Sequence, residues 1–408
     1  MLSFNLEPSQ ISAGARSIVE TLQRAGYTAY VVGGCVRDLL LNLRPKDFDV
    51  ATDATPEEVH ALFRGSRMIG RRFRLVHVRK GREIIEVSTF RGLSGDQETA
   101  HNENVFGSFE EDAFRRDFTI NALYFDPIGN ALLDPTERGL LDITDRALTI
   151  IGDPTTRIIE DPVRMIRAAR FAAKLNFRID DSMQKAIKHN ASLLQVVPPA
   201  RLFEEFLKLA LAGYSAETFR ALEHFGLYQQ LFPAPNGVHP LSEFELRALV
   251  ATDERIRNEQ SVTPAFLLAA LLWSAYDQNK QEHEAQGTAS LEAAEEASEQ
   301  TLIHQLRAIA IPRRFTQAMK EIWLLQDRLT FKVGRRPLRL LENKRFRAAY
   351  DFLLLRAEDA EALKHPADWW TRVQTVPIEE QRHMLKEVTN RPGKSRRRKK
   401  SKSASTTD

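Results

Sequence analysis

Two aspartates, Asp47 and Asp49, stand two positions apart near the end of the stretch AYVVGGCVRDLLLNLRPKDFDV, residues 29–50. If the chain here is extended, both carboxylates point to the same side, because alternate residues of a strand share a face. Gly33 and Gly34 precede them and allow the backbone to approach a ligand closely. Two carboxylates beside a glycine turn and a helix start suit a divalent metal ion that bridges to phosphates. An isolated Asp-x-Asp is more often an ordinary surface feature, but the upstream Gly-Gly-x-x-Arg-Asp favours the metal interpretation.

Further acidic positions could belong to the same chemistry. Glu86 lies within a predicted strand, Ile84 to Phe90. It is either a third carboxylate on the metal side or an exposed residue on one face of a sheet. The sequence EEDAFRRD, residues 110–117, has acids first and then Arg-Arg-Asp. It is either a solvated helix with ion pairs or a second phosphate-and-metal cluster that serves the first.

A third charged pattern lies in residues 159–174, IEDPVRMIRAARFAAK, which predict one helix with Pro162 in its first turn. One acid and three arginines follow at intervals of three and share one edge of this helix: Asp161, Arg164, Arg167 and Arg170. A charged row is usually a solvated face. Here the opposite side is apolar and can pack, so the arginines are free for phosphates, or Asp161 and Arg164 for the edge of a base.

The elements that must position these residues are predicted from local patterns. Short β-branched runs predict strands at 29–32, 75–78 and 84–90. A helix is expected from Val36 to Leu41, and another begins after Thr55, which is followed by Pro56 and, three positions on, by Glu58. After about residue 155 the strand patterns stop and helical patterns take over. The predicted class is therefore α+β, a mixed sheet followed by helices.

Composition sets limits on the function. The chain has 408 residues with 43% hydrophobic and 28% charged residues, which is ordinary for a globular protein of two or three domains. Cys35 is the only cysteine, which excludes an intrachain disulfide and a multi-cysteine zinc site. We expect it to be buried and not a nucleophile. No apolar run is long enough to span a membrane and no secretion signal is recognisable, so the expected location is the cytoplasm.

The net charge of +3 is unevenly distributed. Residues 391–408 carry eight basic side chains against one acidic one, so the rest of the chain is net acidic. This segment cannot bury a core and is expected to be disordered. Basic tails of this kind bind nucleic acid through counterion release. The candidate RNA contacts are Arg396, Arg397, Arg398, Lys399 and Lys400. The alternative is a tail that only improves solubility.

Four stretches resemble one family when taken together and in this order: VGGCVRD at 32–38, KDFD at 46–49, RRDFTINA at 115–122 and EDPVRMIRAARF at 160–171. The chain resembles the polymerase-β-like nucleotidyltransferases of the class that contains bacterial poly(A) polymerases and tRNA CCA-adding enzymes. GRRFRLVHV at 70–78, RFRAAY at 345–350, the helices after Pro198 and the basic tail look like the poly(A) polymerase branch.

The resemblance implies a polymerase-β-like catalytic head at 1–152 and a helical neck with base recognition at 153–215. It further implies a helical RNA-binding body at 216–385 and a basic tail at 386–408. Asp47 and Asp49 would hold two Mg²⁺ ions, for which Mn²⁺ could substitute. Asp117 would be the third catalytic acid, with Glu86 as second choice. The triphosphate would be bound by Gly33, Gly34 and Arg37, with Arg116 assisting. Asp161 and Arg164 would read the edge of the base, and Arg167 would add a further contact to the nucleotide.

The implied reaction is the template-independent addition of AMP from ATP to RNA 3′ ends, with release of pyrophosphate and a role in RNA polyadenylation and decay. The expected partners are RNA 3′ ends, ATP and RNA-decay proteins, and the expected state is a monomer. CCA addition to tRNA is the alternative, because the catalytic motifs do not separate the two reactions. A catalytically inactive RNA-binding protein on the same scaffold is a third hypothesis, which the intact aspartates oppose.

Overall fold

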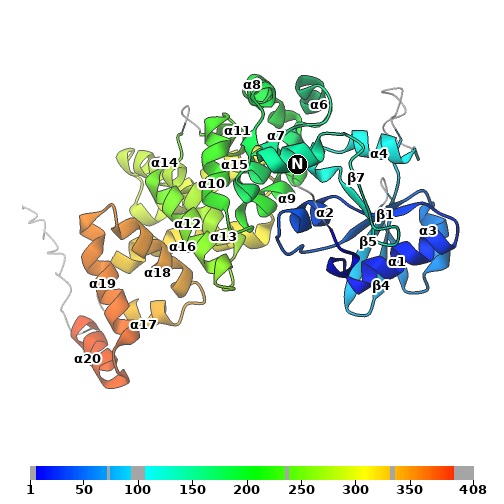
Figure 1. Cartoon of the computed structure of the whole chain (residues 1–408). Coiled ribbons are helices and arrows are strands. Elements are labelled where there is room, and N and C mark those ends of the chain that lie inside the picture. Colours follow the sequence, from blue (N-terminus) through cyan, green and yellow to red (C-terminus); the bar gives the residue numbers. More distant parts are fainter. Residues whose placement is uncertain (1–5, 71–73, 93–105, 235–238, 331–335, 390–408) are drawn as a thin grey trace, which may run out of the picture. The chain divides into compact units, whose positions relative to one another are not determined.

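The computed structural model describes residues 6–70, 74–92, 106–234, 239–330 and 336–389 (Figure 1). The chain forms two compact units. The first comprises residues up to Val197 together with 224–227, and the second comprises 198–223 and the residues from 228 onward. The division falls inside the predicted neck, 153–215. The predicted tail contacts at 396–400 lie outside the described residues.

The first unit is built on a mixed sheet of seven strands, and the second is helical, so the predicted α+β class is confirmed. The strands, in the order β3-β4-β5-β2-β1-β6-β7, are β3 Ser66–Ile69, β4 Leu75–Lys80, β5 Glu83–Thr89, β2 Asp49–Thr52, β1 Ala29–Val32, β6 Tyr124–Asp126 and β7 Ala131–Leu133. Neighbouring strands are antiparallel except β2 and β5, which are parallel. The predicted strands at 29–32, 75–78 and 84–90 are therefore present.

The strand, glycine turn and helix expected at the start of the chain are also present. β1 is buried and β-branched, and it leads through Gly33 into α2, Gly34–Leu40. Gly33 has φ +81° and ψ −130°, a conformation that residues with a Cβ avoid. Its N–H donates to the carbonyl of Leu123, which ties the turn to the segment before β6. The turn is therefore held in place from two parts of the chain.

Capping chemistry explains where two other helices of this unit begin. In α3, Pro56–Leu62, the Thr55 side chain accepts from the N–H of Glu58, and the Glu58 carboxylate accepts from the N–H of Thr55. The same arrangement starts α4, Phe109–Arg115, where Ser108 and Glu111 pair. The end of α4 fixes the position of the Arg-Arg-Asp sequence, since the helix ends immediately before Arg116.

The helix predicted over residues 159–174 is present from Val163 onward, but its predicted start is wrong. The chain instead forms α6, Pro154–Glu160, and α7, Val163–Leu175, separated by Asp161 and Pro162. Asp161 is extended, with φ −148° and ψ 93°, because a residue before proline is sterically excluded from the helical region. Asp161 therefore lies in a bend and not on the helical edge that carries the three arginines.

The remaining helices follow the apolar stripes of the sequence. The first unit also contains α1 Ala13–Arg24, α5 Gly139–Asp145 and α8 Asp181–Asn190. From Pro199 the chain forms α9 Pro199–Ala210, α10 Ser215–His224, α11 Tyr228–Leu231, α12 Glu243–Arg257, α13 Pro264–Leu271, α14 Trp273–Ala285, α15 Ser290–Ala308, α16 Arg313–Thr330, α17 Arg336–Leu341, α18 Phe346–Ala357, α19 Glu361–Thr375 and α20 Ile378–Thr389. In the described ranges, none of these helices is long and apolar enough to cross a bilayer.

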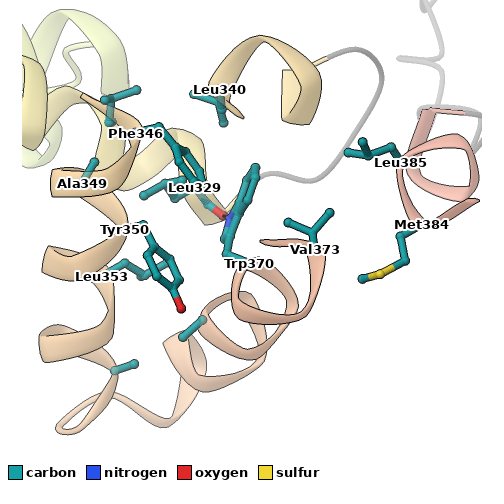
Figure 2. Close-up of a cluster of buried hydrophobic side chains, with 13 residues drawn as sticks. Leu329, Leu340, Phe346, Ala349, Tyr350, Leu353, Trp370, Val373, Met384 and Leu385 are labelled. Carbon is teal, nitrogen blue, oxygen red and sulfur yellow. Dashed lines mark hydrogen bonds between the residues drawn. The ribbon is translucent and has the colours of Figure 1, made fainter. Parts of the chain in front are cut away.

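The last helices of the second unit pack around one tryptophan (Figure 2). Trp370 on α19 is fully buried, and its indole N–H donates to the carbonyl of Leu329 on α16 at 2.7 Å. Phe346, at the start of α18, lies 5.2 Å from it between ring centroids. A buried indole needs such a hydrogen-bond acceptor, so these contacts join three helices.

Candidate active site

Three carboxylates gather where β2 begins. Asp49 is the first residue of β2, and the parallel register pairs it with Glu86 of β5. Asp47 stands two residues before the strand. Burial, reinforced by the charge of Glu86 and to a lesser degree that of Asp47, raises the pKa of Asp49 to about 6, while Arg116 opposes this rise. The mutual repulsion of these carboxylates is only partly offset by the positive charge of Arg116, so their position attracts cations.

Glu86 is thus the acid that the sheet brings next to Asp49. Its Oε2 lies 3.7 Å from Nε2 of His77 on the neighbouring strand β4, and both side chains remain partly exposed. The register places Glu86 beside Asp49, and a role of Glu86 on the metal side stays a prediction.

The donor set fits a divalent cation that is completed by its substrate. In the parts of the chain that the structure describes, no group of three or more His, Cys, Asp or Glu side chains is arranged to hold a metal ion. Mg²⁺ is typically held by one or two carboxylates, with water and substrate phosphates as the other ligands. Asp47 and Asp49, with Glu86 beside them, match that open arrangement.

Arg116 lies against the glycine turn. A methyl group at Gly33 would stand 3.3 Å from Nη1 of Arg116 and 3.6 Å from the carbonyl oxygen of Asn121. The Arg116 side chain is 23% exposed. Burial alone would lower the pKa of Arg116, but its contacts with Tyr124 and Asp112 outweigh burial and raise it. A permanent positive charge therefore faces a turn that has no side chain in the way.

Arg37, predicted to contact a triphosphate, is buried, with only 3% of its side chain exposed. Its Nη1 donates to Oδ1 of Asn121, and Nε donates to Oδ1 of Asp38 at 2.8 Å. The guanidinium also lies over the ring of Phe171, 5.0 Å from its centroid. These contacts make Arg37 part of the framework below the turn, and direct contact with phosphate stays a prediction.

Asp117 is committed to protein partners. One oxygen accepts from the N–H of Phe118 and from Nδ2 of Asn121, and the other accepts from Nε of Arg167 at 2.8 Å. Burial acts to raise its pKa, but the charge of Arg167, together with these hydrogen bonds, holds the pKa of Asp117 below its ordinary value. Asp117 thereby anchors Arg167, and its assignment as the third catalytic acid stays a prediction.

Two of the arginines predicted to be free for a ligand, Arg164 and Arg167, are engaged in ion pairs instead. Arg167 pairs with Asp117, and Nη1 of Arg164 donates to Oε2 of Glu160 at 2.9 Å. The reason lies in the bend at Asp161 and Pro162, which brings the end of α6 against the first turn of α7. A ligand at this position has to compete with Glu160 for Arg164.

Sequence reasoning missed three residues that support this region. Arg157 on α6 donates from Nη2 to the carbonyls of Arg115 and Arg116, at 2.8 and 2.7 Å. Asp112 and Tyr124 both bond to Arg116. Asp112 could have been found from its spacing, since it lies on α4 four residues before Arg116, the residue that caps this helix. The contacts of Arg157 and Tyr124 depend on tertiary packing and leave no local signal.

Cys35 is buried, as expected. Burial raises the pKa of its thiol to about 12, so it is not a reactive thiolate. The chemistry of the site is therefore that of carboxylates and guanidinium groups.

Three family models match successive parts of the chain. The Poly A polymerase head domain matches residues 29–149, the region that holds the sheet, the acids and Arg116. The model described as "Probable RNA and SrmB- binding site of polymerase A" matches 176–236. "Polymerase A arginine-rich C-terminus" matches 286–404.

Individual relatives agree with these models. Poly(A) polymerase I of Salmonella typhi is 44% identical over 95% of this chain and 88% of its own length. The CCA-adding enzyme of Lactobacillus helveticus is 40% identical, but over only 50% of this chain and 52% of its own. The crystal structure of the Bacillus stearothermophilus CCA-adding enzyme in complex with CTP superposes with a TM-score of 0.63 at 27% identity, covering 91% of this chain and 82% of that one. The chain belongs to the bacterial poly(A) polymerase family of nucleotidyltransferases.

Proposed function

We propose that this protein is a polynucleotide adenylyltransferase that adds AMP from ATP to RNA 3′ ends without a template and releases pyrophosphate. The observation that carries the proposal is the acid pair Asp49 and Glu86 close to Arg116, which in turn lies against the Gly33 turn. This arrangement offers carboxylates for a metal ion, and for phosphates it offers the Arg116 guanidinium beside a turn without side chains. The full-length relative is a poly(A) polymerase, whereas the CCA-adding relative covers half of the chain, which favours AMP addition.

Asp47 and Asp49 are the residues proposed to hold the divalent ions, with Mg²⁺ as the first choice and Mn²⁺ as a substitute, and Glu86 acts beside them. Bound there, the metal supplies Lewis-acid chemistry that favours the ionised 3′-hydroxyl and the departing pyrophosphate. Because the pKa of Asp49 is raised, its carboxyl group is protonated in a fraction of the molecules in mildly acidic solution. In these molecules the proton must leave before Asp49 can ligate a metal.

The phosphate side consists of the Gly33–Gly34 backbone and Arg116. Arg116 neutralises the negative charge that develops as the bond to pyrophosphate breaks. Its fixed position helps to hold the triphosphate in the orientation required for transfer of the α-phosphate. Asp117 contributes by holding Arg167, and Arg157 contributes by holding the backbone of the Arg-Arg-Asp sequence.

Asp161 and Arg164 are proposed to read the base. Arg164 would exchange its bond to Glu160 for the acceptor atoms on the adenine edge, and Asp161 would accept from the exocyclic amine. Protein side chains thus take the place of a template strand. Arg167 would be a further contact to the nucleotide.

The body at 216–385 and the basic residues 396–400 are proposed to bind RNA. The charge density of the tail supports a sequence-independent, salt-sensitive contact. A role in RNA polyadenylation and decay, RNA-decay proteins as partners, a monomeric state and a cytoplasmic location complete the proposal.

A single experiment separates the candidate activities. Purified protein is incubated with Mg²⁺ and each nucleoside triphosphate in turn, on an unstructured RNA oligonucleotide and on a tRNA that lacks its CCA end. Long extension of the oligonucleotide with ATP alone supports the proposal. Addition of two C and one A to the tRNA, without extension of the oligonucleotide, supports CCA addition instead. Asp49→Ala serves as the inactive control, and absence of incorporation in every reaction favours an RNA-binding protein without catalysis.

A further inference from the structure

We propose that Tyr124 and Asp112 are positioning residues that aim Arg116 at the triphosphate of the incoming nucleotide. The inference rests on the proposed function, in which Arg116 contacts the triphosphate beside Gly33. Neither residue carries a role in the motifs by which the chain was recognised.

The hydrogen bonds around Arg116 use only one side of its guanidinium. Nε donates to the Tyr124 hydroxyl at 2.9 Å and to Oδ2 of Asp112 at 3.2 Å, and Nη2 donates to the same Asp112 oxygen at 2.9 Å. The Tyr124 hydroxyl in turn donates to the same Asp112 oxygen at 2.6 Å. Tyr124 is therefore acceptor and donor at once, and it closes a three-membered ring of hydrogen bonds.

The third nitrogen of the guanidinium is the one that faces the ligand side. Within the described ranges, Nη1 of Arg116 donates to no protein acceptor, and it is the atom that would stand 3.3 Å from a methyl group on Gly33. Because a guanidinium is planar and rigid, fixing Nε and Nη2 also fixes the direction of Nη1. The two partners thus determine where the remaining donor points.

Both partners are themselves held firmly, and by different elements. The Tyr124 ring on β6 is fully buried and packs edge-on against Phe109, with 4.7 Å between centroids. The same ring lies beneath the Arg116 guanidinium, 5.1 Å away. Asp112 is buried on α4, and its other oxygen accepts from the N–H of Arg91 at 3.3 Å. Sheet and helix therefore converge on one arginine.

The functional consequence is preorganisation. A free arginine side chain loses rotamer entropy when it binds a phosphate, and a fixed one has lost it already. Removing the Tyr124 hydroxyl leaves the ring and its packing but removes the nearer of the two acceptors for Nε and leaves only Oδ2 of Asp112 at 3.2 Å. We expect Tyr124→Phe to raise KM for ATP roughly 3- to 10-fold, the range for one hydrogen bond, with KM for RNA unchanged.

The matched control is Tyr30→Phe. Tyr30 belongs to the same aromatic cluster, with its ring centroid 6.2 Å from that of Tyr124, and the substitution removes the same atom. The second variant, Arg116→Lys, retains the charge but cannot keep the forked geometry. The readout is a double-mutant cycle on KM for ATP and KM for RNA, with Tyr124→Phe measured alone and in the Arg116→Lys background.

The proposal holds if Tyr124→Phe impairs ATP use, Tyr30→Phe does not, and the Tyr124 change has no further effect when Arg116 is already lysine. It is overturned if Tyr124→Phe behaves like Tyr30→Phe, if its effect is the same in both backgrounds, or if KM for RNA changes equally. A wild-type enzyme that does not incorporate AMP, or an Arg116→Lys variant with unaltered kinetics, instead contradicts the proposed function or the place of Arg116 in it.

Discussion

Asp49 and Glu86 are direct neighbours in the one parallel strand pair described in the sheet, although 37 positions separate them in the chain. Side chains at paired positions of adjacent strands lie on the same face, so the two carboxylates share one environment. This relationship, and not the Asp-x-Asp spacing alone, distinguishes the site from an ordinary acidic surface.

Glu86→Gln tests whether the neighbour of Asp49 takes part in catalysis. If Glu86 supports the metal site, we expect kcat to fall about 10- to 100-fold, the range seen for groups that support metal ligands. Steady-state ATP incorporation at saturating RNA measures the effect. Glu83→Gln, on the same strand but exposed, is the control. Unchanged kcat in Glu86→Gln, together with a large loss in Asp117→Asn, would reverse the assignment in favour of Asp117.

Asp49→Asn should abolish activity but increase the stability of the folded protein. The pKa of about 6 in the folded chain exceeds the ordinary value of 3.8, so the folded state holds this proton more tightly than the unfolded state. The stability that protonation contributes is complete below about pH 4 and is lost as the pH rises through about 6. Asparagine has no such loss. In the absence of metal, at about pH 7, we expect the inactive variant to be more stable by on the order of 1–2 kcal/mol.

Thermal or urea unfolding in EDTA between about pH 4 and 8 checks this expectation. The stability difference between variant and wild type should grow from about pH 4 to 6 and then remain constant. Asp53→Asn, an exposed aspartate just after β2, is the control. A variant that is less stable than the wild type at every pH would contradict the repulsion argued for Asp49.

Arg164→Ala should reduce the selectivity for ATP over other nucleotides more than it reduces the rate of nucleotide addition. With Arg164 absent, the adenine edge loses its proposed donor, and incorporation of ATP should approach that of the other nucleotides. Each missing discriminating contact corresponds to about 1–3 kcal/mol, or roughly 5- to 150-fold in the ratio of kcat/KM values. Competition between ATP and CTP on one oligonucleotide measures the ratio. Arg178→Ala, which removes an exposed ion pair with Asp181, should leave it unchanged.

Trp370→Ala should unfold the end of the second unit. The substitution removes a fully buried indole and leaves the carbonyl of Leu329 without its donor, in the cluster of Figure 2. A loss of about 3–5 kcal/mol is typical of such a cavity. All four tryptophans of the chain lie in the second unit, so tryptophan fluorescence in guanidinium chloride follows this unit alone. Trp369→Ala, at a partly buried neighbour, should lose clearly less.

Local chemistry explains the parts of the fold that the sequence predicts well. The β-branched run at 29–32, the glycine turn and the cap at Thr55 each act within a few residues, and all three are present. The bend at Asp161 was missed although Pro162 was visible, because the apolar pattern runs through it without interruption. In the sequence, a proline in the first turn of a helix cannot be distinguished from a proline that follows the end of another helix, when the residues before it also have a helical pattern.

The site itself depends on contacts that no local pattern contains. The parallel register of β2 and β5 pairs Asp49 with Glu86, and the packing of β6 against α4 brings Tyr124 to Arg116. The motif resemblance supplied Arg116 and Asp117 as candidates but not their partners. Sequence reasoning thus names the charged groups, whereas their division into ligand-facing and supporting side chains requires the three-dimensional structure.

The two adjacent glycines of the turn differ in what mutation they can tolerate. Gly33 combines a positive φ with the close approach of Arg116, so any replacement damages the backbone and the arginine together. At Gly34 the backbone is helical, and the nearest atom to an added methyl group, Nη2 of Arg37, is 3.5 Å away, an ordinary contact. Alanine fits at position 34 in the free protein, so a loss of ATP binding there would report the space needed by the nucleotide. In a deep mutational scan, position 33 should be intolerant for folding and position 34 only for activity.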